Sequence, residues 1–198
     1  MLSENRKKFE KVSAWIGQIF SKTGISANTF TLASLLFATI SFVFLVRMKI
    51  NWALLFFIIA SILDLIDGAV AKVRGESTKT GAYLDTICDR YVEGLILLGF
   101  LFLPLPKILL PSEIWIFLCL FGALMTTYSK AAAKEKEIVN EELKKGILER
   151  PERIILIFLA MILAKFEIFH FSVYILIIFA ILSNITALQR IIYTLKIK

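Results

Sequence analysis

The chain has 198 residues, 58% of them hydrophobic, and a mean hydropathy of +0.78. This apolar content exceeds that of soluble proteins and indicates a membrane protein with a single domain, residues 1–198. The formal net charge of +7 is typical of a basic integral membrane protein, so we expect no nucleic-acid partner. Cys88 and Cys119 lie in apolar segments, which predicts buried packing residues rather than a disulfide framework.

The chain begins with a polar stretch and continues with six apolar ones. Residues 5–22 place apolar side chains near helical spacing with lysines opposite, which predicts an amphipathic juxtamembrane helix on the membrane surface that ends at Gly24. Six transmembrane helices are predicted at 29–48, 51–73, 80–103, 112–134, 151–166 and 170–193. Pro151 is expected in the first turn of the fifth helix. The predicted fold is therefore an all-α integral membrane protein with a six-helix bundle over 29–193.

Basic residues are distributed unequally between the two ends of these spans. An even number of spans puts both termini on one side, and that side collects eighteen of the 23 lysines and arginines against four on the other. Cytoplasmic loops of membrane proteins carry such an excess. We therefore expect a multi-pass protein of the cell membrane, with both termini, the active site and a polar cavity on the cytoplasmic side.

Four aspartates lie within segments whose flanks are apolar. Asp64 and Asp67 are three residues apart, so they share one helix face. Asp85 and Asp89 are four apart and share a face in the same way, and the turn composition of 73–79 brings the two helices together. A carboxylate at mid-bilayer costs about 2.5–3.5 kcal/mol, so it normally lines a wet or metal-filled cavity. Hard oxygen ligands favour Mg²⁺ or Mn²⁺ over zinc, which predicts a two-metal site.

The spacing D-x2-D-G-x2-A-K-x8-G-x3-D-x3-D resembles the signature of the CDP-alcohol phosphotransferases, which usually have Arg where this chain has Lys72. The matching residues are Asp64, Asp67, Gly68, Ala71, Gly81, Asp85 and Asp89. The resemblance implies that all four aspartates are metal ligands and that a hydroxyl attacks the lipid-bearing phosphate of a CDP-lipid while CMP leaves. It also implies that Asp89 accepts the hydroxyl proton and that the protein is a homodimer.

The same resemblance implies a set of contacts to the CDP-lipid. They are Asn28, Thr31, Asp67, Gly68, Ala71, Lys72, Thr78 and Gly81. The run GISANTFTL resembles the family's G-[IL]-S-P-N-x2-T segment, with Ala27 in place of proline. From the residues alone, Asn28 is more simply a helix N-cap, and close helix packing is an alternative explanation for the two glycines. Lys72 would meet the phosphates as a point charge.

Glu93 lies one turn beyond Asp89 and outside the signature, and we expect it to pair with Arg90.

Basic residues at the cytoplasmic ends of the last three spans predict an acceptor that carries a phosphate. They are Lys130, Arg150, Arg153 and Arg190. A rim that touches anionic lipid headgroups is the alternative. The segment GILERPERIIL and the late TALQR resemble those of phosphatidylinositol phosphate synthases and their archaeal counterparts. That resemblance implies that Lys130, Arg153 and Arg190 hold inositol phosphate, with Thr127 as a hydroxyl partner.

These features predict an enzyme that transfers lipid phosphate from a CDP-lipid to inositol 1-phosphate. Two glutamines beside many Ile, Lys and Glu are typical of a thermophile, so CDP-archaeol is a candidate donor beside CDP-diacylglycerol. The alternative within the family is a phosphatidylglycerophosphate synthase that uses glycerol 3-phosphate. A divalent-cation transporter would spread its carboxylates through the membrane depth, whereas these aspartates cluster toward one end of their spans.

Overall fold

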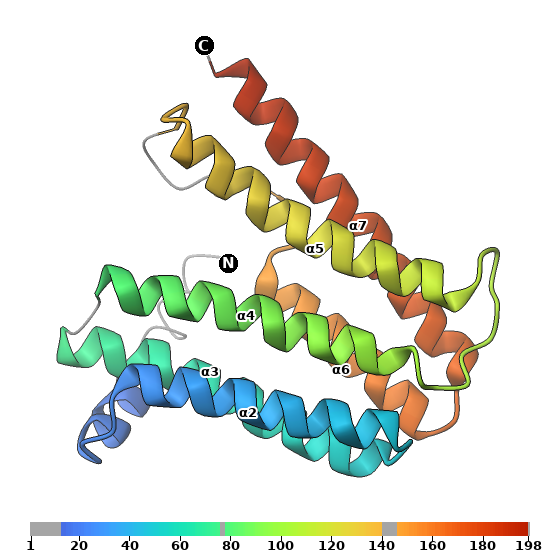
Figure 1. The fold of residues 1–198 in the computed structure, drawn as a ribbon, viewed down its shortest axis with the longest axis horizontal. Helices are drawn as coiled ribbons and strands as arrows, with labels where there is room; N and C mark the ends of the chain where they lie inside the picture. The colour runs from blue at the N-terminus through green and yellow to red at the C-terminus, as the bar shows by residue number, and fades with distance from the viewer. Residues whose placement is uncertain (1–12, 76–77, 140–145, 198) are drawn as a thin grey trace. The chain divides into compact units, whose positions relative to one another are not determined.

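The computed structural model describes residues 13–75, 78–139 and 146–197, and these ranges form helices and connecting segments without a β-strand. A short helix over 13–21 precedes six longer helices (Figure 1). These are α2 (Ala27–Val46), α3 (Ile50–Arg74), α4 (Lys79–Phe100), α5 (Ser112–Glu135), α6 (Arg150–Lys165) and α7 (Phe169–Lys196). Each predicted interval overlaps one of them, with ends that agree within three residues. The all-helical prediction is confirmed; residues 5–12 of the predicted juxtamembrane helix lie outside the described ranges.

Prolines set two of the helix ends. α4 stops at Phe100, earlier than predicted, and residues 101–103 form a turn before Pro104. A proline disfavours the helical conformation of the residue before it and offers no N–H of its own. Pro151 lies in the first turn of α6, as predicted, where a helix needs no N–H from it. Cys88 and Cys119 are buried free thiols, also as predicted.

Among the residues that the structure describes, four helices are long and apolar enough to cross a membrane: α2, α3, α5 and α7. Only 33–44% of the apolar window of each is buried within the protein, so most of its side chains face outward, as they do in lipid-facing helices. α4 carries five charged residues, and α6 has 16 residues, about 24 Å of helix. These two helices fall outside the same criteria. The chain is a multi-pass membrane protein.

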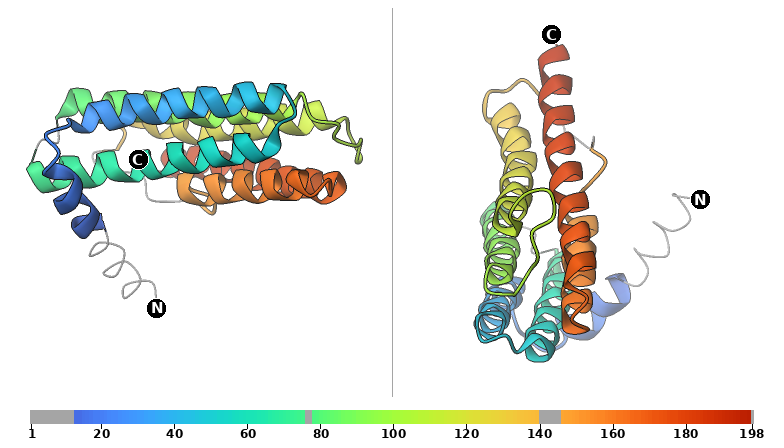
Figure 2. Two further views of the ribbon diagram at one scale, coloured as in Figure 1. Left: turned by 90° about the horizontal axis from the view of Figure 1, so that it is seen from below. Right: turned by 90° about the vertical axis from the view of Figure 1, so that its right-hand side faces the viewer.

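The helices divide into two compact units, Met1–Phe44 with Trp52–Leu95, and Leu45–Asn51 with Ile96–Lys198. In the first unit, the Ser41 hydroxyl of α2 donates to the Ala53 carbonyl of α3 at 2.7 Å. The short helix over 13–21 runs at an angle to α2 and α3 (Figure 2). The bond from Ser41 to Ala53 holds α2 against α3, the helix that carries Asp64 and Asp67.

In the second unit, α7 packs along α5 and along α6. A Cβ atom added to Gly122 of α5 would overlap the Ser183 hydroxyl and lie 2.7 Å from Nδ2 of Asn184 on α7. The glycine therefore allows the two helices to approach closely, as small residues do in membrane bundles. The Thr126 hydroxyl donates to the Ser183 carbonyl at 3.0 Å, which fixes the register of α5 against α7.

Candidate metal and nucleotide site

The end of α3 and the start of α4 have features that reverse the chain between the two aspartate pairs. α3 ends at Arg74, and Gly75 has a φ of +65°, the left-handed conformation that commonly follows a helix and favours glycine. Thr78 then caps α4, because its hydroxyl accepts the N–H of Gly81 at 3.0 Å. α3 and α4 therefore lie with their aspartate-bearing faces toward each other, because Asp64 and Asp67 of α3 lie close to Asp85 of α4.

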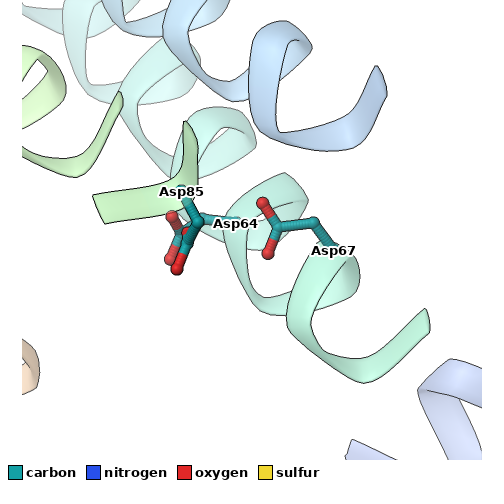
Figure 3. Close-up of side chains that lie close together, drawn as sticks. All are labelled: Asp64, Asp67 and Asp85. Atoms are coloured by element: carbon teal, nitrogen blue, oxygen red, sulfur yellow. The ribbon is translucent and has the colours of Figure 1, made fainter. Parts of the chain in front are cut away.

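Asp64, Asp67 and Asp85 form the centre of the site. One carboxylate oxygen of each lies within 4.8 Å of the others, and Figure 3 shows the three side chains close together. At that separation two carboxylates repel each other by about 3 kcal/mol at an effective dielectric constant of ~20. A cation between them removes this repulsion, and hard oxygen ligands suit Mg²⁺ or Mn²⁺. The three side chains therefore fit a divalent metal ion.

Asp67 is tied to the neighbouring helix. Its side chain is buried, and its Oδ2 atom accepts a hydrogen bond of 2.6 Å from the hydroxyl of Thr31 on α2. Thr31 is itself buried, and its hydroxyl oxygen also lies 3.2 Å from the Ala27 carbonyl oxygen. The sequence predicted Thr31 as a contact to the nucleotide; the structure places its hydroxyl on a candidate metal ligand. This bond fixes one oxygen of Asp67 and connects α2 to α3 at the level of the cluster.

The structure does not bring Asp89 into this group. Asp89 is buried one turn further along α4, and its Oδ2 atom lies 3.5 Å from Nη2 of Arg90. The other terminal nitrogen of Arg90 lies 3.8 Å from the Glu93 carboxylate, and Glu93 is only 1% exposed. The predicted pairing of Glu93 with Arg90 is confirmed. Arg90 therefore compensates two buried carboxylates on one face of α4.

A cavity of about 190 Å³ opens beside Asp67 and Asp85. It is lined by Ala27, Asn28, Thr31, Asp67, Gly68, Ala71, Thr78, Gly81, Ala82 and Asp85, which come from α2, α3 and the start of α4. Seven of the eight predicted contacts to the CDP-lipid belong to this lining. Lys72, the eighth, is not part of the lining, although it follows Gly68 by one helical turn.

Gly68 and Gly81, the two glycines of the signature, have different surroundings. A Cβ atom on Gly68 would meet no atom within 4 Å, so close helix packing does not explain this glycine. A side chain there would extend into open space at the cavity wall. A Cβ atom on Gly81 would lie 3.1 Å from both Asn28 Oδ1 and Thr78 Oγ1. Gly81 therefore allows two polar groups of the cavity wall to lie close to the backbone of α4.

The start of α2 corrects one alternative drawn from the sequence. The Thr29 N–H donates to the Ser26 hydroxyl at 3.3 Å, so Ser26 caps the helix and Asn28 does not. The Asn28 side chain is exposed at the cavity. Ala82 also lines the cavity, although the sequence reasoning gave it no role. Its signal was the small side chain directly after Gly81.

The predicted acceptor residues lie in the second unit. Arg153 of α6 and Arg190 of α7 are buried, with 1% and 6% exposure. Arg190 donates to the Thr126 carbonyl at 2.8 Å and lies 3.6 Å from Glu149 Oε1. The sequence reasoning gave Glu149 no role, although the E-x-x-E spacing before α6 indicated a helix start: the Glu149 N–H donates to the Glu152 carboxylate at 3.1 Å.

The remaining predicted residues surround the same helix ends. Thr127 and Lys130 follow Thr126 on α5 and are half-buried, and the Thr127 hydroxyl lies 3.4 Å from the Ala123 carbonyl that accepts its proton. Arg150 is the first residue of α6. Buried guanidinium groups are rare in membrane helices and mark functional sites. Their two-pronged geometry matches a phosphate group.

Comparisons with known proteins agree with this arrangement. Residues 25–192 match the sequence model of the family described as CDP-alcohol phosphatidyltransferase. Archaetidylinositol phosphate synthase of Pyrococcus horikoshii is 34% identical over 195 residues, which cover 96% of this chain and 95% of that protein. Phosphatidylinositol phosphate synthase of Mycolicibacterium smegmatis is 28% identical over 201 residues, covering 94% of this chain and 85% of that protein.

Solved structures share the fold. The crystal structure of Mycobacterium tuberculosis phosphatidylinositol phosphate synthase with CDP-DAG bound is similar with a TM-score of 0.78 at 23% identity, over 94% of each chain. The same protein in complex with manganese and citrate also gives a TM-score of 0.78, at 24% identity, over 93% of this chain and 89% of the other. The family match and the relative at 34% identity together show that the chain belongs to the CDP-alcohol phosphatidyltransferase family.

Proposed function

We propose that this protein transfers the lipid-phosphate group of a CDP-lipid to inositol 1-phosphate and releases CMP. The observation that carries the proposal is the convergence of three carboxylates from α3 and α4 beside a cavity lined by the predicted donor contacts. The names of the relatives, archaetidylinositol phosphate synthase and phosphatidylinositol phosphate synthase, support the acceptor. CDP-archaeol and CDP-diacylglycerol are the candidate donors. We treat residues 1–198 as one catalytic domain.

The donor would bind in the cavity of the first unit. Asp64, Asp67, Asp85 and Asp89 would hold two Mg²⁺ or Mn²⁺ ions, which supply the positive charge that a diphosphate needs. Manganese in the structure of a relative supports this choice of ion. Asn28 and Thr78 present an amide and a hydroxyl for hydrogen bonds to the nucleotide.

The proposed reaction is a displacement at phosphorus. The acceptor hydroxyl oxygen attacks the lipid-bearing phosphorus, the bond from this phosphorus to CMP breaks, and CMP leaves with the electron pair. Asp89 takes the hydroxyl proton. Its carboxylate is buried and lies beside Arg90, which holds the base in a defined orientation.

The acceptor phosphate would bind to the buried arginines of the second unit. Arg153 and Arg190 repel each other, and an anion between them relieves that repulsion. Glu149, whose side chain is half-exposed, lies 3.6 Å from Arg190. Lys130, Arg150 and Thr127 would add further donors from α5 and α6. The gathering of these basic side chains in one unit supports an acceptor that carries a phosphate over a free alcohol.

We further infer six spans, with α4 and α6 crossing the membrane beside the four helices that meet the length and composition criteria. Both termini and the active site, with its polar cavity, would then face the cytoplasm at the cell membrane, where the basic residues collect. Trp15 and Ile19 on the short helix are 63% and 43% exposed, as expected for a helix at the membrane surface. A homodimer is expected by analogy with the family.

The assignment is tested by CMP release from purified protein. CDP-archaeol and CDP-diacylglycerol are each offered with inositol 1-phosphate, glycerol 3-phosphate and free inositol. Of the three acceptors, we expect only inositol 1-phosphate to support CMP release. A chelator should abolish this release, and added Mg²⁺ or Mn²⁺ should restore it. Turnover only with glycerol 3-phosphate would refute the acceptor, and full activity in the presence of a chelator would refute the metal.

Gly68→Leu should block the donor cavity. The leucine fills open space, so the fold is retained and helix propensity improves by about 1 kcal/mol. We expect KM for the CDP-lipid to rise at least ~10-fold while thermal stability in detergent is kept. Leu65→Phe on the exposed side of α3 is the matched control and should behave as wild type. A wild-type KM in Gly68→Leu would place the donor elsewhere.

Asp89→Asn should separate chemistry from binding. The amide keeps the size of the side chain but accepts no proton, so turnover should fall by ~10²–10⁴-fold. Binding of CDP-lipid, measured by titration of the purified variant, should stay close to wild type. Joint loss of binding and turnover would mean that Asp89 mainly anchors a metal ion.

Arg153→Ala should act on the acceptor. Loss of a two-pronged contact to phosphate should raise KM for inositol 1-phosphate by ~10-fold or more without a matching change for the CDP-lipid. Arg153→Lys should recover part of the loss, and Lys165→Ala, an exposed charge at the other end of α6, should have no effect. An unchanged acceptor KM would remove Arg153 from the acceptor site.

A further inference from the structure

A side chain from the end of α3 holds the linker that leads into α2. Arg74 donates through Nη1 to the carbonyl of Ile25 at 2.9 Å and through Nη2 to the carbonyl of Ser21. Ser21 is the last residue of the short helix over 13–21, and the final carbonyls of a helix lack an intrahelical N–H partner. One guanidinium group therefore closes the end of this helix and spans the linker, residues 22–26. A planar fork with two donors is suited to this bridging role.

The short helix also packs against α3. Its Ile16 and Phe20 contact a buried cluster of Phe30, Ile66 and Val70. The rings of Phe20 and Phe30 meet edge to face, with centroids 6.0 Å apart. The helix is therefore fixed by an apolar contact along its length and by Arg74 at its end.

A glycine makes this close approach feasible. A Cβ atom on Gly17 would lie 2.5 Å from the carbonyl oxygen of Ala69 and 2.6 Å from Cγ2 of Val73. Both distances are shorter than real Cβ atoms tolerate, so a larger residue at position 17 would displace the helix from α3.

The linker ends at the donor cavity. Gly24 takes a φ of +76° and turns the chain, and Ser26 caps α2. The residues that follow, Ala27 and Asn28, line the cavity, whereas Arg74 does not. The place of Asn28 at the cavity wall is therefore set from outside the cavity, by the bonds that hold the linker.

We propose that Arg74 is a positioning residue for the CDP-lipid donor: it holds the linker against α3 and thereby fixes the α2 wall of the cavity. The inference rests on the proposed function of this cavity as the donor site. Trp15 and Ile19 of the short helix over 13–21 are exposed, as expected for a segment at the lipid surface. The bonds from Arg74 therefore also connect this segment to the cavity wall proposed to meet the nucleotide.

Kinetics of Arg74 variants test the proposal. Arg74→Ala should raise KM for the CDP-lipid about tenfold, equivalent to about 1.4 kcal/mol, and leave kcat and the acceptor KM within about twofold. Arg74→Lys keeps the charge but loses the fork, so it should resemble the alanine variant. Lys22→Ala removes an exposed charge from the same linker and should behave as wild type. A wild-type donor KM in Arg74→Ala, or full function in Arg74→Lys, would overturn the proposal.

Hydrogen exchange supplies a readout that needs no turnover. In Arg74→Ala, the backbone amides of residues 22–29 should exchange faster than in wild type, while those of α5 and α7 stay unchanged. Gly17→Ala displaces the same helix and should reproduce both effects, which keeps the test decisive if Arg74→Ala does not fold. Faster exchange with an unchanged donor KM would reject the positioning role. Absence of CMP release from either CDP-lipid by the wild-type protein would instead reject the proposed function. The exchange rates of residues 22–29 would still show whether Arg74 holds the linker.

Discussion

Mutual repulsion among three carboxylates is the constraint on which the first unit depends. Asp64, Asp67 and Asp85 are carried by two largely apolar helices, yet one oxygen of each lies within 4.8 Å of the others. Several local features serve to hold them there: the turn at Gly75, the cap from Thr78, and the bond from Thr31 to Asp67. Such a concentration of negative charge favours the binding of a divalent cation, because the cation removes the repulsion that folding has introduced.

The second unit presents the opposite electrostatic situation. Arg153 and Arg190 are buried on neighbouring helices, and Glu149 lies 3.6 Å from Arg190. The two guanidinium groups repel each other, and a phosphate group placed between them would relieve that repulsion. The proposed ligands of the two units therefore differ in sign at the protein contact: a metal ion at the aspartates of the first unit, and a phosphate group at the arginines of the second. This division supports the proposed reaction, which needs both.

Local sequence patterns predicted the six helices and the meeting of three aspartates, because helical spacing alone decides which residues share a face. Spacing does not decide side-chain orientation: Asp89 is not among the three carboxylates that lie within 4.8 Å of one another, and its Oδ2 atom lies 3.5 Å from Arg90. Contacts between distant parts of the chain were beyond the same reasoning. Arg74 contacts carbonyls 49 and 53 positions earlier, and Arg190 reaches a glutamate in the segment before α6. The spacing of residues along a helix gives no information on contacts between residues so far apart in the sequence.

The residues assigned to the donor and to the acceptor occupy separate parts of the chain. Every proposed donor contact lies in Met1–Phe44 or Trp52–Leu95, and every proposed acceptor contact lies in Ile96–Lys198. If these proposed assignments hold, mutations that alter the choice of alcohol can accumulate in the C-terminal half without changing a residue proposed to bind the CDP-lipid. On this view, related enzymes can acquire new headgroup specificities through changes in the C-terminal half of the chain. Exchanging that half between homologues is then a rational route to new polar lipids.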